Sequence, residues 1–325
     1  MPIRYLVTGG AGFIGSHLVE ALVAEGHEVV VFDNFSTGRR ENLAPWRDRV
    51  RVVEGSVTDL ATCEVAAAGV DYVLHQAALP SVPRSLQDPA STHAANATGT
   101  LNMLIAARAA GVRRLVYASS SSVYGNTPEL PKREDMPPRP LSPYAVSKLA
   151  GEYYCRAFTA SFGLETVALR YFNVFGPRQD PTSQYAAAVA RFVAAALEGT
   201  SPTIFGDGGA TRDFTYVGNV VRANLLACRA SSDVVGNAYN IGCGSRVSVR
   251  ALWDRIREMT GTQVDARHAA SRSGDVRDSL AAVNLAREHL RYEPTIDLEQ
   301  GLAMTIAAAR EAVMPDETPL TRSVS

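Results

Sequence analysis

A glycine-rich loop near the start of the chain restricts the fold more than any other feature. The loop, Thr8-Gly-Gly-Ala-Gly-Phe-Ile-Gly15, follows the apolar run 5–7 and leads into a helical pattern over residues 14–24. Glycines at Gly9, Gly12 and Gly15 let the backbone turn sharply after a strand and pack a helix closely on a sheet. The amino end of that helix would face a phosphate group. This order predicts a dinucleotide site, although the spacing is GxxGxxG and not GxGxxG.

Alternating strand and helix patterns continue along the chain. A long helical pattern covers residues 92–110. Further short apolar runs lie at residues 28–32, 50–53, 72–74, 114–118, 166–172 and 238–241. Strands that are apolar along their whole length are typical of a parallel sheet with helices on both faces. The predicted fold class is therefore α/β, with a Rossmann-like, doubly wound parallel sheet.

The length of 325 residues allows one large domain and a smaller partner. We expect a smaller C-terminal substrate-binding domain whose segments are interleaved with those of the first. The expected division assigns residues 1–173 to the dinucleotide-binding domain with 213–242 returning to it, 174–212 and 243–314 to the substrate-binding domain, and 315–325 to a mobile tail.

Charge and cysteine usage exclude several classes of partner. Lysine and arginine number 32 against 33 aspartate and glutamate, so neither nucleic acid nor an anionic membrane is expected as a partner. Charges interrupt every apolar stretch well before the roughly 18 residues of a membrane span, and no signal peptide pattern is present. The four cysteines are scattered, which favours reduced thiols in a cytoplasmic protein over disulfides or a metal site.

An acidic residue ends the second predicted strand. Asp33 lies about 20 residues after the glycine loop, where a dinucleotide fold carries the acid that binds the adenosine ribose. A carboxylate accepts hydrogen bonds from ribose hydroxyls and repels a 2′-phosphate, so NAD is favoured over NADP. Arg39 and Arg40 are close enough to keep the second cofactor open.

A tyrosine and a lysine stand four residues apart at the start of a predicted helix. Ser142 is a good N-cap and Pro143 suits the first helical position, so Tyr144 and Lys148 should share one face. A positive charge near a phenol favours the phenolate and lowers its pKa, which makes Tyr144 a candidate general base. An ordinary exposed helix face is the alternative interpretation.

A run of serines, Ser119-Ser-Ser-Ser122, ends the fifth predicted strand. Ligands of open α/β sheets bind beyond the carboxyl ends of the strands, so this run falls where a nicotinamide and its substrate would meet. Taken alone, the serines could equally form a polar loop or cap backbone groups.

Together these motifs resemble the extended short-chain dehydrogenase/reductase superfamily, and within it the UDP-sugar 4-epimerase branch, that of UDP-glucose and UDP-N-acetylglucosamine 4-epimerases. The resemblance covers nearly the whole chain. The residues that carry it are Asp33-Asn-Phe-Ser-Thr-Gly38, His75-Gln-Ala-Ala78, Asn96-Ala-Thr-Gly-Thr100, Leu169-Arg-Tyr-Phe-Asn173, Gly206-Asp-Gly208, Arg212-Asp-Phe, Tyr239-Asn-Ile-Gly242 and Gly274-Asp275.

The resemblance implies NAD as cofactor and a UDP-sugar as substrate. Tyr144 would be the base, Lys148 would activate it and hold the nicotinamide ribose, and Ser120 would bind the sugar O4. The implied cofactor residues are Gly9, Gly12, Phe13, Ile14, Gly15, Asp33, Asn34, Ser36, Gly38, Ser56, Val57, Gln76, Ala77, Ala78, Asn96, Tyr144, Lys148 and Tyr171. The implied substrate residues are Ser81, Ser120, Ser122, Tyr144, Asn173, Arg212, Arg272, Asp275 and Ser279.

Two features depart from the family or lack a role in it. An acid after the third strand commonly meets the adenine, but Ser56 stands there, with Asp59 three residues later. His75 and His93 match no catalytic role, so we interpret both as structural.

The implied reaction is epimerisation at C4 by transient oxidation, rotation of a 4-keto sugar and return of the hydride. Lyases of the same scaffold carry Asp-Glu where Ser121-Ser122 stand, and UDP-glucuronate decarboxylases carry Glu at Ser122. UDP-glucuronate 4-epimerase and a non-catalytic NAD-sensing protein are further alternatives. Family members are usually homodimers, through a four-helix contact for which residues 92–110 and the helix after Tyr144 are candidates.

Ser279 occupies the place of a bulky tyrosine that narrows the pocket in epimerases restricted to UDP-glucose and UDP-galactose. A small side chain there would leave room for an N-acetyl group at C2, and Ser81 lies in a segment similar to the branch that accepts such sugars. We therefore expect UDP-GlcNAc and UDP-GalNAc as substrates besides UDP-Glc and UDP-Gal. The alternative is that Ser279 merely points into solvent.

Overall fold

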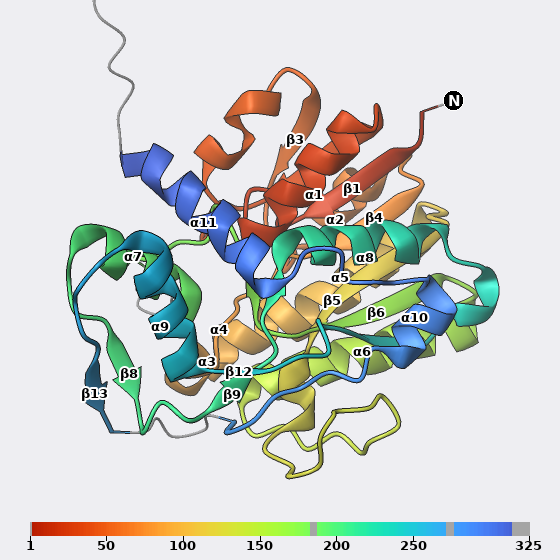
Figure 1. The fold of residues 1–325 in the computed structure, drawn as a ribbon. Coiled ribbons are helices and arrows are strands. Elements are labelled where there is room, and N and C mark those ends of the chain that lie inside the picture. Colours follow the sequence, from red (N-terminus) through yellow and green to blue (C-terminus); the bar gives the residue numbers. More distant parts are fainter. Residues whose placement is uncertain (1, 183–186, 271–275, 314–325) are drawn as a thin grey trace, which may run out of the picture.

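A parallel sheet of seven strands forms the centre of the molecule (Figure 1). The computed structural model describes residues 2–182, 187–270 and 276–313. The strand order is β11-β6-β5-β4-β1-β2-β3, and every neighbouring pair is parallel. The strands span Arg4–Thr8 (β1), Glu28–Asp33 (β2), Val50–Glu54 (β3), Tyr72–His75 (β4), Arg114–Ser120 (β5), Glu165–Tyr171 (β6) and Ala238–Ile241 (β11). The order reverses between β1 and β4, which is where such sheets bind ligands.

Helices cover both faces of this sheet, as the apolar strands predict. One face packs against α1 (Phe13–Ala24), α8 (Val217–Arg229) and α10 (Asn284–Leu290), whose buried side chains share one apolar cluster. The other face packs against α2 (Leu60–Ala67), α5 (Gly99–Ala109) and α6 (Pro143–Phe162), whose buried side chains form a second cluster. The predicted Rossmann-like, doubly wound fold is confirmed.

The helix expected over residues 92–110 is not one regular helix. It begins as α4 (Pro89–His93), widens into a π-helical turn over Ala94–Thr98 and continues as α5. A short helix, α3 (Val82–Gln87), precedes it. π-Helical turns occur preferentially at functional sites, and this one contains Asn96.

A separate lobe contains α7 (Ala188–Glu198), α9 (Val249–Thr260) and α11 (Leu298–Val313) (Figure 1). Phe192 and Trp253 meet edge-to-face at its centre, with ring centroids 5.5 Å apart. Short strand pairs complete the lobe and its connections. They are β8 (Thr203–Phe205) with β13 (Arg267–Ala269), β7 (Val174–Phe175) with β10 (Thr215–Tyr216), and β9 (Thr211–Arg212) with β12 (Val247–Ser248).

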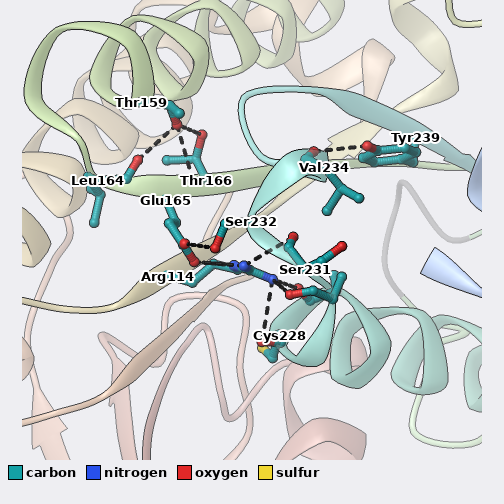
Figure 2. Close-up of polar contacts among 12 residues, drawn as sticks. Arg114, Thr159, Leu164, Glu165, Thr166, Cys228, Ser231, Ser232, Val234 and Tyr239 are labelled. Atoms are coloured by element: carbon teal, nitrogen blue, oxygen red, sulfur yellow. Dashed lines mark hydrogen bonds and ion pairs between the residues drawn. The ribbon is translucent and has the colours of Figure 1, made fainter. Parts of the chain in front are cut away.

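A buried arginine ties the start of β5 to the end of α8 (Figure 2). Arg114 is fully buried, and its guanidinium donates to the carboxylate of Glu165 at 2.7 Å. It also donates to the carbonyl oxygens of Ala227 at 2.7 Å and Ala230 at 2.8 Å, at the carboxyl end of α8. A cation is favourable at that end of a helix. Arg114 therefore fixes the chain just before it enters β11.

Two further properties concern the chain as a whole. Within the described ranges, no helix is both long and apolar enough to cross a membrane. All four cysteines are free thiols. The expected mobile tail, 315–325, lies outside the described residues.

Candidate active site

The glycine loop turns from β1 into α1 at the carboxyl edge of the sheet, and two of its glycines have no room for a side chain. Gly9 has φ +64°, and a Cβ there would lie 2.8 Å from the backbone nitrogen of Ala77. A Cβ on Gly15 would lie 2.1 Å from the carbonyl oxygen of Gly9. Gly12 is the N-cap of α1, and no side chain caps the helix there. The amino end of α1 therefore fits a pyrophosphate, which can accept hydrogen bonds from its exposed N–H groups.

Asp33 lies beside this loop at the end of β2. Its carboxylate is buried and accepts from the backbone nitrogens of Ala11 at 2.9 Å and Phe35 at 2.8 Å. Burial raises the pKa of Asp33, and these N–H donors oppose the rise. A Cβ on Gly38 would lie 2.9 Å from the same carboxylate, so the loop after β2 closes against it. Asn34 accepts from the backbone and hydroxyl of Ser36 and shapes that loop.

Arg39 and Arg40, the two arginines considered as ligands of an NADP phosphate, each form an ion pair with a carboxylate of the protein. Arg39 pairs with Asp180 at 2.7 Å, and Arg40 pairs with Glu54 at 2.6 Å. With their charges paired in this way, the surroundings of Asp33 fit an unphosphorylated ribose better than a 2′-phosphate.

The adenine side of the site has no acid in the family position. The hydroxyl of Ser56 lies 2.8 Å from that of Thr58. Asp59 caps α2 by accepting from the backbone nitrogen of Ala61 at 3.1 Å, so its carboxylate serves the helix. Val57 is buried and accepts from Asn102 through its carbonyl oxygen.

Polar side chains link β4, β6 and α8 where strands β4 and β6 end. Gln76 and Tyr171, both expected at the cofactor, share hydrogen bonds with Asn224 of α8. Asn224 is fully buried and was not foreseen. Ala77 follows Gln76 and donates its N–H to the hydroxyl of Thr8 at 3.1 Å, which holds the loop after β4 against β1.

The side chains of Asn96 and His75 both form hydrogen bonds with other groups of the protein. Asn96 is fully buried, and its amide bonds the backbone of Leu79 and the hydroxyl of Ser147 on α6. His75 is fully buried between the hydroxyls of Thr8 and Thr100, and burial lowers its pKa to about 3. This neutral histidine fits the structural role expected of it. His93 is exposed on α4.

The catalytic candidates meet between β5 and α6. Ser142 caps α6 by accepting from the backbone nitrogen of Ala145 at 3.2 Å, and Pro143 is at the first helical position. Ser120 lies near the phenol of Tyr144 and lowers its pKa against the larger effect of burial. Ser120 Oγ in turn accepts from the backbone nitrogen of Ser122 at 3.2 Å. The phenol of Tyr144 and the hydroxyl of Ser120 therefore lie near each other at the end of β5.

Lys148 lies one helical turn from Tyr144 and contacts strand β5. Lys148 is buried and donates to the carbonyl oxygen of Ala118 at 2.8 Å. Burial lowers the pKa of Lys148 to about 8. Burial also raises the pKa of Tyr144, and the nearby Ser120 opposes that rise. In the polypeptide alone the pKa of Tyr144 is thus shifted in the direction opposite to the expected lowering, and loss of water is the largest cause of that shift.

Ser122 presents an unsatisfied group next to this pair. Its Oγ is buried, and no partner for it exists among the described residues. A buried hydroxyl without a hydrogen-bond partner in the protein costs free energy. In such a place a bound ligand often supplies the missing hydrogen bond. This atom fits a hydroxyl of a bound substrate.

The other predicted substrate residues that the structure describes lie in loops or on the short strand β9. Ser81 and Asn173 have φ of 104° and 32°, and such strain in residues other than glycine is concentrated at binding sites. Arg212 donates to the carbonyl oxygens of Thr211 and Arg277. Ser279 is only 7% exposed, which is contrary to a side chain that points freely into solvent. Arg272 and Asp275 lie outside the described residues.

A buried ion pair behind the catalytic residues was also not foreseen. Glu152 is two helical turns beyond Tyr144 on α6 and pairs with Arg170 of β6 at 2.8 Å. Ser119 donates to the same carboxylate. Arg170 lies in a motif quoted for the resemblance, so the sequence contained a signal but not its partner.

A family model for the NAD dependent epimerase/dehydratase family matches residues 5–242. The chain belongs to this family. It is 41% identical to the UDP-glucose 4-epimerase of Mycolicibacterium smegmatis over 308 residues, which are 94% of this chain and 97% of that relative. The resemblance expected from the motifs is therefore confirmed.

Solved structures of family members superimpose closely. UDP-glucose 4-epimerase of Thermotoga maritima, solved with UDP-glucose, has a TM-score of 0.92 at 38% identity, covering 96% of this chain and 100% of that one. UDP-N-acetylglucosamine 4-epimerase of Methanobrevibacter ruminantium, in complex with UDP-N-acetylmuramic acid, has a TM-score of 0.90 at 37% identity, covering 96% and 100%. The family therefore contains enzymes for both kinds of sugar.

Proposed function

We propose that this protein is an NAD-dependent 4-epimerase of UDP-sugars. The observation that carries the proposal is the proximity of Tyr144 and Ser120, beside the hydroxyl of Ser122, which has no partner among the described residues. These groups stand at the end of β5, at the edge of the sheet that also carries the glycine loop. A base and hydroxyls near a nicotinamide suit oxidation of a secondary alcohol.

Each residue has a defined part in this reaction. Tyr144 takes the proton from the sugar O4 and later returns it, while Ser120 and Ser122 hold that oxygen by hydrogen bonds. Lys148 places a positive charge one turn behind the phenol. When bound, NAD supplies the acceptor and donor of the C4 hydride. Gly9, the amino end of α1 and Asp33 would hold its pyrophosphate and adenosine ribose.

The same residues argue against the lyase alternatives. Elimination of water at C5 and C6 needs an acid and a base beside the sugar, and Ser121 and Ser122 supply neither. UDP-glucuronate 4-epimerase remains the second candidate, since it shares the serine run.

The substrate range proposed here includes N-acetylated sugars. Ser279 is small and buried, at the place where restricted epimerases carry a bulky tyrosine. Family members that act on UDP-glucose and on UDP-N-acetylglucosamine resemble the chain about equally. We therefore propose UDP-Glc/UDP-Gal and UDP-GlcNAc/UDP-GalNAc as its substrates. The expected interleaved division of the chain would place Ser279 in the smaller domain.

We also propose that the protein is a cytoplasmic homodimer. Four large hydrophobic side chains of α6 are exposed, namely Val146 at 51%, Tyr153 at 55%, Tyr154 at 38% and Phe162 at 49%. Helix α5 packs beside α6, so two copies could bury these side chains in a four-helix contact. The four free thiols suit a reducing compartment.

Product analysis tests the proposed reaction directly. Purified protein with NAD is incubated separately with UDP-Glc, UDP-GlcNAc and UDP-GlcA, and the products are resolved by NMR. A 4-epimer from either of the first two supports the proposal. Epimerisation of UDP-GlcA alone would favour the second candidate, and a 4-keto-6-deoxy product or released CO₂ would identify a lyase.

A further inference from the structure

The segment of residues 277–282 carries Ser279 but belongs to no helix and no extended strand. Within the described part of the chain it forms isolated bridges, between Asp278 and Thr211 and between Ala281 and Lys132. Backbone hydrogen bonds accompany them, from Ser279 to Thr211 at 3.0 Å and from Lys132 to Leu280 at 2.7 Å. The position of Ser279 therefore depends on a few individual contacts.

One of these contacts is made by a buried carboxylate. Asp213 follows Arg212 in a motif quoted for the resemblance, and no role was assigned to it. Its Oδ2 accepts from the backbone nitrogens of Ala281 at 3.1 Å and Gly244 at 3.0 Å, and its Oδ1 accepts from that of Cys243 at 2.8 Å. One side chain thus joins segment 277–282 to the loop after β11.

The surroundings of Asp213 are closed and contain no counter-charge. The side chain is fully buried, and no basic group of the described residues pairs with it. A Cβ on Gly242 would lie 2.9 Å from Asp213 Oδ2 and 2.6 Å from the Cβ of Ala281. The glycine of the Asn-Ile-Gly motif is therefore required for this contact.

The titratable groups that face Asp213 keep their charge state near neutral pH. The thiol of Cys243 has a pKa raised to about 12, and burial also raises the pKa of the Tyr292 phenol, which donates to the carbonyl oxygen of Gly242. On the segment itself, the pKa of Asp278 is lowered by its bond to Thr211. Arg277 pairs with Asp207 at the surface.

Asp213 is costly to keep ionised. Burial raises its pKa to about 6, although three N–H donors oppose the rise. The folded-state pKa of Asp213 lies above its unfolded value. Ionisation of this group therefore lowers the stability of the folded protein as pH rises from about 4 through 6. Asparagine would avoid the charge, but it offers one acceptor atom and would turn an NH₂ group toward an N–H donor. Only a carboxylate of this size can accept all three bonds.

Two predicted substrate residues, Arg212 and Asn173, adjoin or contact Asp213. Arg212 is a predicted phosphate ligand, and Asn173 donates to the carbonyl oxygen of Asp213 at 3.2 Å. We propose that Asp213 is a positioning residue for the UDP-sugar: its carboxylate holds segment 277–282, and with it Ser279, at the sugar site. The proposal rests on the proposed function and extends it, because the binding of the sugar then depends on a group that never touches it.

Hydrogen exchange tests the positioning without reference to activity. We expect the Asp213→Asn variant to exchange the amides of Cys243, Gly244 and Ala281 faster than the parent, while peptides of β1 and α6 are unchanged. Asp254→Asn is the matched control, because Asp254 is an exposed carboxylate on α9 that pairs with Arg250 at the surface. Unchanged exchange of all three amides in Asp213→Asn would overturn the proposal, even if the protein proves not to be an epimerase.

Kinetics test the consequence for the substrate. In the parent, KM for the UDP-sugar is expected to rise as pH falls through 6, with kcat changed less. Asp213→Asn should have a KM on the order of tenfold higher at pH 7.5, and that KM should no longer depend on pH between about 5 and 7.5. A parental pH profile in Asp213→Asn overturns the proposal. If the variant does not fold, a parental KM that stays constant through pH 6 overturns it as well.

Discussion

Lys148 donates its ammonium to the carbonyl oxygen of Ala118 at 2.8 Å, two residues before Ser120 on β5. The contact crosses from α6 to the strand that carries the serine run. It therefore fixes the helix of Tyr144 against the strand of Ser120. The ammonium also lies 5.2 Å from the ring centroid of Tyr117, so one buried cation holds the two halves of the site together.

Removing the phenolic oxygen of Tyr144 should abolish turnover but leave the fold intact. Tyr144→Phe keeps the ring and loses the phenolic oxygen, which is the proposed proton acceptor beside Ser120. We expect kcat to fall by about 10²–10⁴, with NAD bound as in the parent. Epimer formation is measured by NMR and NAD content after denaturation. Activity within tenfold of the parent would show that another group is the base.

The unpartnered hydroxyl of Ser122 leads to opposite effects on stability and activity. Ser122→Ala removes a buried polar atom that lacks a partner, so the free energy of unfolding should stay the same or rise by about 1 kcal/mol. Turnover should fall, because the substrate loses a hydrogen bond. Denaturant unfolding and steady-state kinetics give the two values. Ser85→Ala is the control for a serine whose hydroxyl is already bonded, at 2.7 Å to the carbonyl oxygen of Val82. A large loss of stability in Ser122→Ala would contradict the interpretation.

Ser279 decides the sugar range if the proposed substrate preference is right. Ser279→Tyr introduces a bulky ring at a position that is 7% exposed. The kcat/KM of the variant for UDP-GlcNAc should fall strongly, whereas kcat/KM for UDP-Glc should change much less. The reason is that C2 carries a bulky N-acetyl group in UDP-GlcNAc and a hydroxyl in UDP-Glc. Ser279→Ala is the matched control and should retain both activities. Equal loss for the two substrates would mean that the position is not selective.

Local patterns predicted the parts of the site that short segments build. The glycine loop, the cap at Ser142 and the strand ends needed only neighbouring residues, and the structure has them as expected. The contacts of Glu152 and Asp213 could not be predicted from local patterns, because their partners are distant in the sequence. The π-helical turn at Asn96 also has no periodic signature that distinguishes it from an ordinary helix.

In the polypeptide alone, the pKa shift of Tyr144 also differs from the expected lowering, for a related physical reason. Spacing along a helix places a charge near a phenol, and this favours the phenolate. It says nothing about how many layers of protein exclude water from that phenol. Burial is a property of the packed fold, and here it dominates.

The pair of Glu152 and Arg170 should be essential for stability. Both side chains are 6% exposed, and two contacts of 2.8 and 2.9 Å join them. Glu152→Gln leaves Arg170 buried without its counter-charge, so we expect a loss of about 3–5 kcal/mol in the free energy of unfolding. Asp254→Asn breaks an exposed pair and should cost less than about 1 kcal/mol. Urea unfolding at pH 7.5 compares the two, and similar small losses would show that the buried pair contributes little.

His75 should make the fold sensitive to acid. Burial, and to a smaller extent the charge of Lys148, lowers the pKa of His75 to about 3. The unfolded chain takes up a proton near pH 6.5, whereas the folded protein does so only near 3. The contribution of His75 is therefore fully present above pH 6.5 and is lost as pH falls toward 3, at up to about 1.4 kcal/mol per pH unit. His75→Gln should be less stable at pH 7.5, since the ring bonds to Thr8 and Thr100 are lost, but its stability should fall less steeply with acid. His93→Gln, at an exposed histidine, should keep the parental slope. Unfolding by urea between about pH 4.5 and 7.5 measures all three slopes, and a parental slope in His75→Gln would show that another group senses the acid.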